Sequence, residues 1–217
     1  MAQPDLTFRH AAEADIPALL ALIQSAYRGE ESCKGWTTEA DLVEGDRIDE
    51  PGLRAKIAEP DGAVLVATVP GPSGTDEIIA CCEVLHRSAG PVEGDKTTTT
   101  TTTTTNGASA DTAAAAPQVG YFGLFAVSPT LQGGGIGRRV LEHAEGYARQ
   151  RWPGVAAMEM TVIAARADII AWYGRRGYVP SATEPTRPFP HEHVAAMKGG
   201  RVLRDDLYFV VLEKVFG

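Results

Sequence analysis

Apolar residues in the segment 16–27 recur at the three- and four-residue spacing of an amphipathic helix. Pro17 falls in the first turn of this segment, where its missing N–H costs little, and Asp15 stands where an N-cap is expected. The apolar face consists of Leu19, Leu20, Ile23 and Tyr27. The pattern therefore predicts an opening helix that packs one face against a core.

The region after this helix is polar and carries weaker helical signals. Thr38 followed by Asp41 is a loose capping box, which predicts a short second helix. Residues 53–58 predict one more helical turn before Pro60.

Runs rich in Val, Ile and Cys predict two strands, over residues 63–69 and 78–85, and the turn residues between them predict an antiparallel hairpin. Further along, strands are expected at 119–127, 156–163, 178–182 and 206–216, and helices at 136–150 and 167–177. A hairpin followed by a strand–helix–strand crossover predicts an α/β domain with a mixed sheet.

Residues 87–117 interrupt this pattern with a low-complexity stretch that includes nine consecutive threonines, Thr97 to Thr105. Threonine favours strands, but nothing in this stretch alternates apolar with polar residues. Because the stretch has no apolar face to bury, the conformational entropy lost on ordering it should outweigh any gain from folding. We expect a single domain over residues 1–217 that carries a disordered insert at 87–117.

Composition narrows the class of protein. Hydrophobic residues make up 44% and charged residues 22% of the 217 residues, which is ordinary for a globular domain. The formal charge of -8 argues against partners such as nucleic acid or an anionic membrane. Three cysteines, two of them adjacent, do not suit a disulfide framework, and no apolar run suits a signal peptide or a membrane span. We expect a soluble cytoplasmic protein, with a nuclear location left open.

Four glycines, Gly133, Gly134, Gly135 and Gly137, stand at the start of the helix predicted for 136–150. The first turn of a helix has backbone N–H groups without partners and the positive end of the helix dipole. Glycines let an anion approach this backbone closely, so a phosphate site is expected. A dinucleotide fingerprint would need glycine where Arg138 stands, and a Walker loop would need lysine there.

The remaining pattern, Gln132, Gly135 and Gly137 between a strand and an amphipathic helix, resembles the coenzyme A motif of the GNAT superfamily of acyltransferases. The stretch "RADIIAWYGRRGY" is similar to the second cofactor motif of that family, and Tyr173 stands at the position of the family tyrosine. The resemblance covers nearly all of the chain except the insert. It implies a mostly antiparallel mixed sheet flanked by helices.

The resemblance also implies where acetyl-CoA binds. The backbone of the strand end would hold the pantetheine arm, and the glycine loop would hold the pyrophosphate. The cofactor residues expected on this basis are Phe125, Ala126, Val127, Gln132, Gly133, Gly134, Gly135, Ile136, Gly137, Arg138 and Arg166. Arg166 replaces the asparagine that usually begins the second motif, and it could reach a cofactor phosphate or an acidic neighbour.

Two side chains are expected to carry the chemistry. Tyr173 matches the tyrosine that gives a proton to the departing thiolate. At the two positions where family members place a glutamate base, this chain has Tyr121 and Thr161. Glu83 is the best substitute, and Glu159 is a weaker candidate. No histidine cluster suggests a metal.

Residues 28–50 hold eight acidic and three basic residues, a net charge of -5. This surplus would attract a cationic amine, with Glu30, Glu31 and Trp36 as candidate substrate contacts, although a solvated surface is equally expected. The stretch "GWTTEADL" also resembles one found in a subgroup of GNAT proteins and brings no substrate with it.

The favoured function is therefore N-acetylation of a primary amine, with a small cationic molecule as the expected acceptor. A protein or peptide N-acetyltransferase and a non-catalytic acyl-CoA-binding module stay open as alternatives. The oligomeric state is also open, with a homodimer as one alternative.

Overall fold

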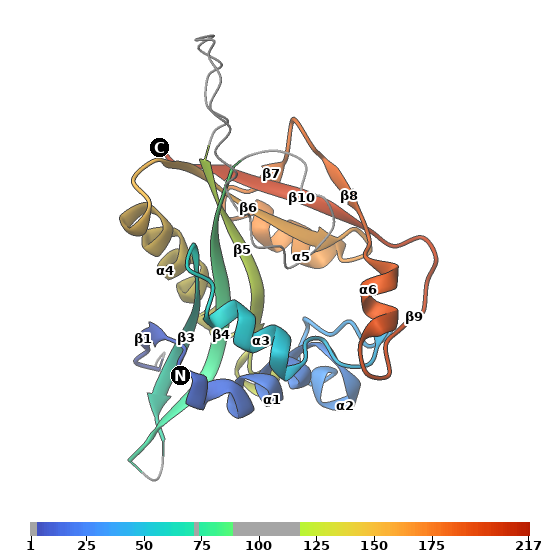
Figure 1. The fold of residues 1–217 in the computed structure, drawn as a ribbon, viewed down its shortest axis with the longest axis horizontal. Helices are drawn as coiled ribbons and strands as arrows, with labels where there is room; N and C mark the ends of the chain where they lie inside the picture. The colour runs from blue at the N-terminus through green and yellow to red at the C-terminus, as the bar shows by residue number, and fades with distance from the viewer. Residues whose placement is uncertain (1–3, 72–73, 89–117) are drawn as a thin grey trace, which may run out of the picture.

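The computed structural model of the protein describes residues 4–71, 74–88 and 118–217, and its centre is one mixed sheet (Figure 1). In spatial order the strands are β1 (Thr7–His10), β3 (Gly62–Pro70), β4 (Asp76–Ser88), β5 (Gln118–Val127), β6 (Val155–Ile163), β10 (Tyr208–Val215) and β7 (Val179–Pro180), with β8 (Thr186–Pro188) also paired to β10. Among these pairs, only β5 and β6 run parallel. The predicted α/β fold with a mostly antiparallel sheet is confirmed.

The predicted hairpin is formed by β3 and β4, and β4 continues past the predicted start of the insert. Arg87 pairs with Val119 and Ser88 pairs with Gln118 at the beginning of β5. The boundary predicted at residue 87 was therefore wrong by two residues. The rest of the predicted insert, residues 89–117, lies outside the described residues.

Helix α1 (Ile16–Tyr27) has the predicted bounds, but Asp15 does not cap it. The Asp15 carboxylate instead accepts a hydrogen bond from the Ala12 N–H at 2.7 Å and closes a 3₁₀ turn, η1 (Glu13–Asp15). Helix α3 (Glu50–Ile57) begins earlier than predicted because Asp49 caps it, accepting from the Gly52 N–H at 2.8 Å.

The short helix predicted after Thr38 is absent from the structure of residues 38–42, which form turns leading to β2 (Val43–Glu44). The Thr38 hydroxyl accepts from the Ala40 N–H at 3.2 Å and lies 2.6 Å from the Ser32 hydroxyl. Local side-chain bonds of this kind stabilise a turn in competition with a helix. A single helical turn, α2 (Gly29–Ser32), precedes this segment instead.

Helices cover both faces of the sheet, and each layer has its own core. Helices α4 (Ile136–Arg151) and α5 (Ala167–Gly174) contribute to the larger core, which includes Val140, Ala144, Tyr173, Phe122 and Met158. Helices α1 and α3 contribute Leu19, Ile23 and Leu53 to the core on the other face. In the crossover from β5 through α4 to β6, the glycine loop follows the carboxyl end of β5, a central strand of the sheet.

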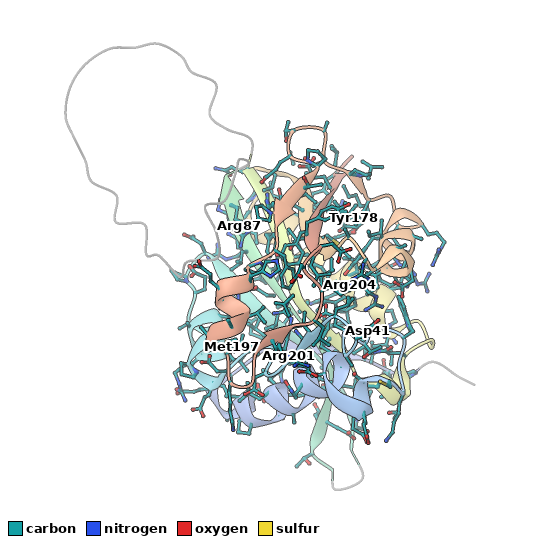
Figure 2. All side chains as sticks on the ribbon, turned by 90° about the vertical axis from the view of Figure 1, so that its right-hand side faces the viewer. Asp41, Arg87, Tyr178, Met197, Arg201 and Arg204 are labelled. Atoms are coloured by element: carbon teal, nitrogen blue, oxygen red, sulfur yellow. The ribbon has the colours of Figure 1, made fainter. Side chains whose placement is uncertain are left out.

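A third, smaller core lies beside two elements that the sequence analysis did not predict. Helix α6 (His191–Ala196) and β9 (Arg201–Val202) connect β8 to β10, and β9 pairs with β2 through Val43 and Val202. Leu42, Val43, Ile163, Phe189 and Leu207 are buried together there. Figure 2 faces this side of the molecule, with Met197 and Arg201 labelled on the connection.

Candidate active site

Strand β5 separates from β6 halfway along its length. The two strands pair only as far as Tyr121 and Glu159, whereas β5 stays paired with β4 up to Ala80 and Val127. Leu124 has φ 45°, a left-handed conformation that is uncommon for a residue other than glycine, at the point where the strand turns away. Beyond Tyr121, the edge of β5 that faces β6 is therefore open, and it borders a cavity of about 1410 Å³.

The glycine loop forms one end of this cavity. Gly133 and Gly135 have φ angles of 82° and 84°, which favour glycine, and a side chain at Gly133 would meet no atom within 4 Å. The first amide of α4 bonded to a loop carbonyl is that of Arg139, which donates to Gly135 at 3.3 Å. In the described part of the chain, the amides of residues 136–138 have no backbone partner, so they can bind an anion.

Arginines surround this helix start, and Arg176 was missed by the sequence analysis. Burial lowers the pKa of Arg176, and the neighbouring charges of Arg175 and Arg138 lower it further. Its guanidinium lies 3.5 Å from the centre of the Trp172 ring and donates to the Trp172 carbonyl at 2.6 Å, while its Nε is buried with no partner among the described residues. The adjacent arginines of the sequence "GRRG", residues 174–177, were the feature that could have indicated Arg176 as a phosphate contact. A cluster of like charges beside free amides fits a phosphate-bearing group.

Tyr173 lies on α5 and borders the same cavity. Its side chain is 6% exposed, and burial raises its pKa well above the ordinary value, so the phenol stays protonated at neutral pH. The ring packs edge-on against Trp172 and Tyr178, at centroid distances of 5.0 and 5.7 Å. No residue in the described part of the chain hydrogen-bonds its hydroxyl, which leaves this proton donor free for another group.

Glu83 is 3% exposed and borders the cavity from β4. Both of its carboxylate oxygens accept hydrogen bonds from Lys56 of α3, at 3.0 Å each. Glu83 pairs with Gly123 on the separated part of β5, and an added Cβ at Gly123 would lie 3.1 Å from Glu83 Oε2. The carboxylate is therefore close to the open strand, and Lys56, which no sequence signal marked, holds it.

The other candidate base is placed differently. Glu159 is 5% exposed and is absent from the cavity lining, and its carboxylate accepts from Arg187 at 2.8 Å. The two residues that replace the family glutamates, Tyr121 and Thr161, hydrogen-bond each other at 3.0 Å. Of the two carboxylates, Glu83 is the one that faces the cavity.

The backbone of Phe125, Ala126 and Val127 lies at the separated end of β5, where the resemblance placed the pantetheine arm. The hydroxyl of Tyr27, a residue expected only to pack, donates to the Phe125 carbonyl. A carbonyl oxygen can accept a second hydrogen bond, so this contact leaves room for another donor.

Gln132 and Arg166 bind the chain between α2 and β2. The Gln132 side chain accepts from the Trp36 N–H at 2.8 Å and donates to the Thr37 hydroxyl at 2.8 Å and the Val127 carbonyl at 3.0 Å. Arg166 is 8% exposed and donates to three backbone carbonyls in this segment and to Asp168. The expected contact of Arg166 with the cofactor therefore competes with bonds inside the protein.

The three candidate substrate residues are separated by the fold. Trp36 lines the cavity, with its ring centre 6.3 Å from that of Trp172. Glu30 and Glu31 lie on α2, do not line the cavity, and are exposed. Three other acidic residues of the segment 28–50 line the cavity: Glu39, Asp46 and Asp49. Glu39 is paired with Arg28 at 2.6 Å, so the acidic surplus is not concentrated at the site.

Two further features are absent from the part of the chain that the structure describes. Within residues 4–71, 74–88 and 118–217, no group of three His, Cys, Asp or Glu side chains is arranged to hold a metal ion. The same residues contain no helix both long and apolar enough to cross a membrane.

Comparisons with known proteins agree with this geometry. No curated protein matches the chain significantly. Among solved structures, a ribosomal-protein-alanine N-acetyltransferase from Brucella melitensis is 22% identical, with a TM-score of 0.54 over 97% of this chain and 99% of that one. NAA60 from Arabidopsis thaliana in complex with acetyl-CoA is 12% identical, with a TM-score of 0.63 over 98% and 99%.

A spermidine N-acetyltransferase chimera derived from Vibrio cholerae is 12% identical, with a TM-score of 0.55 over 97% of this chain and 95% of that one. At these identities the likeness shows the fold. The profile of the acetyltransferase (GNAT) family, by contrast, matches residues 24–178, which is most of the chain. With the separated strands, the free helix start and the buried tyrosine already in place, this match shows that the chain belongs to the GNAT family of acetyltransferases.

Proposed function

We propose that the protein transfers an acetyl group from acetyl-CoA to a primary amine that enters the cavity beside Glu83. The observation that carries the proposal is the meeting, around one cavity, of a free helix start, an open strand edge, a buried carboxylate and a buried phenol. Acetyl-CoA would supply the activated acetyl group as a thioester. The chain's own groups would bind the cofactor and move the protons.

Binding of the cofactor divides between two parts of the chain. The free amides at the start of α4, those of residues 136–138, and the glycine loop before them, with Arg138 and Arg176 beside them, would hold the pyrophosphate. The open edge of residues 125–127 would bind the pantetheine arm as an added strand. An N–H near Phe125 would then polarise the thioester carbonyl as negative charge develops on it.

Glu83 would act as the general base and Tyr173 as the general acid. An amine with a pKa near 10.4 is almost entirely protonated at pH 7, so its attack requires a proton acceptor. Glu83 lies beside the open strand and would take this proton, directly or through a water, once the acceptor ammonium competes with Lys56. Tyr173, a phenol that is protonated at neutral pH and whose pKa burial raises further, would give its proton to the departing thiolate.

The acceptor that we favour is a small amine. The connection between β8 and β10 meets β2 and closes one side of the cavity, which favours a compact acceptor or a chain end over a long extended peptide. Glu83 favours a cationic group, whereas the acidic residues Glu30 and Glu31 lie outside the cavity.

The proposal is tested by thiol release from acetyl-CoA with a panel of amines. The panel contains spermidine, phosphinothricin, free amino acids and a peptide with N-terminal alanine, because proteins of similar fold are named for such acceptors. Glu83→Gln should lower turnover of the best amine by about 10² to 10⁴-fold. Glu77→Gln, an exposed residue of the same strand, is the control and should keep full turnover.

Binding is measured separately by calorimetry with coenzyme A. Gly135→Glu places a negative side chain at the start of α4 and should abolish binding. Unchanged affinity in this variant would remove the phosphate site from the proposal. Tight binding of acetyl-CoA by the wild type without transfer to any panel amine would favour a non-catalytic acyl-CoA-binding module.

A further inference from the structure

The segment Gly35 to Thr38 belongs to the "GWTTEADL" stretch. Side chains from two distant parts of the chain hold it by hydrogen bonds to its backbone. Arg166 lies at the N-cap position of α5, far along the chain from this segment. Its guanidinium has five N–H donors in a fixed plane, and the partners of all five can be identified.

Every one of these donors has an acceptor inside the protein. Nε and Nη2 donate to the Asp168 carboxylate at 3.0 and 2.8 Å. Nη2 also donates to the Trp36 carbonyl at 2.7 Å, and Nη1 donates to the Thr37 and Thr38 carbonyls at 3.0 and 2.5 Å. No donor is left for a phosphate of the cofactor.

Gln132 binds the same segment from the glycine loop. It accepts from the Trp36 N–H and donates to the Thr37 hydroxyl, so its amide is also engaged at both ends. Gly35 makes this approach possible, because an added Cβ there would lie 2.5 Å from Gln132 Oε1. The segment is therefore tied to both of the stretches that resemble cofactor motifs.

The tied segment continues directly into the acceptor side of the cavity. The Glu39 N–H donates to the Tyr27 carbonyl at 3.0 Å, and Glu39 pairs with the buried Arg28. Trp36, Thr37, Glu39 and Arg28 all line the cavity. Fixing the backbone at Trp36 to Thr38 thus fixes a wall of the space that an acceptor must enter.

We propose that Arg166, Gln132 and Gly35 hold residues 36–38 as a rigid wall of the acceptor site, so that Arg166 is a positioning residue and not a ligand of acetyl-CoA. The proposal rests on the proposed function for the identity of that site. It also gives the glycine of the "GWTT" sequence a specific task. Arginine at position 166 suits this task because an asparagine is too short and has too few donors to bond three successive carbonyls.

The test compares Arg166→Ala with Arg204→Ala by hydrogen–deuterium exchange and calorimetry. Arg204 pairs with Asp206 at 2.9 and 2.7 Å, in the same two-residue spacing as Arg166 and Asp168, but it is exposed and outside the cavity lining (Figure 2). In Arg166→Ala, the amides of residues 34–40 should exchange faster, while those of residues 132–140 should not change. The dissociation constant of coenzyme A should stay within about threefold of the wild-type value.

Kinetics with the best amine of the panel give a further measure. Arg166→Ala should raise the KM of the amine by about tenfold or more, with a smaller effect on kcat. Gly35→Ala leaves Arg166 intact, and it should also speed amide exchange at residues 34–40 and raise the KM of the amine. This variant keeps the proposal testable if Arg166→Ala does not fold. Arg204→Ala should behave as wild type throughout.

Two results would overturn the proposal. One is a loss of coenzyme A affinity of about tenfold or more in Arg166→Ala, which would make the arginine a cofactor ligand. The other is unchanged exchange at residues 34–40 in both Arg166→Ala and Gly35→Ala. If the wild type acetylates no panel amine, the proposed function fails, but exchange and calorimetry still decide whether Arg166 holds the wall.

Discussion

Removal of one hydroxyl can distinguish a catalytic tyrosine from a structural one. The protein offers a matched pair for this test, because Tyr173 and Tyr178 are both buried and in contact, and their hydroxyls differ in hydrogen bonding. Tyr173 borders the cavity and its hydroxyl has no hydrogen bond within the described residues, whereas the Tyr178 hydroxyl donates to Glu145 at 3.0 Å. Both side chains are buried, at 6% and 2% exposure, and their rings touch. Replacement of each by phenylalanine keeps the ring and deletes the hydroxyl.

The expected effects on stability have different sizes. Tyr178→Phe removes a hydrogen bond to a buried carboxylate, which is worth about 1.5–3 kcal/mol. In a protein of this size each kcal/mol corresponds to about 2–4 °C, so the melting temperature should fall by roughly 3–12 °C. Tyr173→Phe removes a buried hydroxyl that has no hydrogen-bond partner among the described residues, so the free energy of unfolding should stay the same or rise slightly.

The expected effects on turnover are reversed. Tyr173→Phe should lower turnover by about 10² to 10⁴-fold, since general-acid assistance has that magnitude. Tyr178→Phe should keep wild-type turnover below its lowered melting temperature. The assay is thiol release with the best panel amine at saturating acetyl-CoA, together with single-turnover measurements that isolate the chemical step. Near wild-type single-turnover rates in Tyr173→Phe would refute the assignment of Tyr173 as the general acid.

Two predictions concern the rest of the fold. Replacement of residues 89–117 by Asn-Gly should leave the melting temperature and the coenzyme A affinity nearly unchanged, since Ser88 and Gln118 are already paired and long loops add little closure entropy; a loss of several degrees would contradict this. Alkaline pH should destabilise the protein. Burial raises the pKa of Cys81 from 9.0 to about 12 and raises those of Tyr27 and Tyr173 above 10.0. The folded state therefore keeps protons that the unfolded state loses, and the stabilisation present below about pH 9 is lost as the pH rises; a urea midpoint that stays constant up to about pH 10.5 would contradict this.

The sequence predicted the elements well where the spacing of apolar residues determines them. The bounds of α1 follow from apolar spacing, and the hairpin of β3 and β4 follows from two β-branched runs with a turn between them. Prediction failed at Thr38, where a bond to the nearby Ser32 outweighed the capping signal. It also failed at Asp15, whose side chain closes the turn before the helix instead of capping the helix itself.

Prediction of the site was limited by contacts between distant parts of the chain. The glycine loop could be placed because the start of a helix is a local feature. Arg166 donates to the backbone carbonyls of residues 36–38, which are about 130 residues away in the sequence, so no local pattern predicts these contacts. The same reason hid Lys56, which meets Glu83 of β4 only because α3 packs over the neighbouring strand β3. Residues 183–205 carry neither helical nor strand periodicity, so α6 and β9 could not be expected.

The pairing of β2 with β9 has a consequence for biosynthesis. A chain leaving the ribosome presents Val43 early, but its partner Val202 emerges only after the glycine loop, Tyr173 and all of β6. Strand β10, which covers the far edge of β6, emerges later still. Because chains begin to fold from the end that is made first, the part that would hold the cofactor can assemble before the connection between β8 and β10 closes one side of the cavity. A nascent chain at that stage would expose the edge of β6 that β10 later covers, and an unpaired strand edge of this kind can pair with another chain.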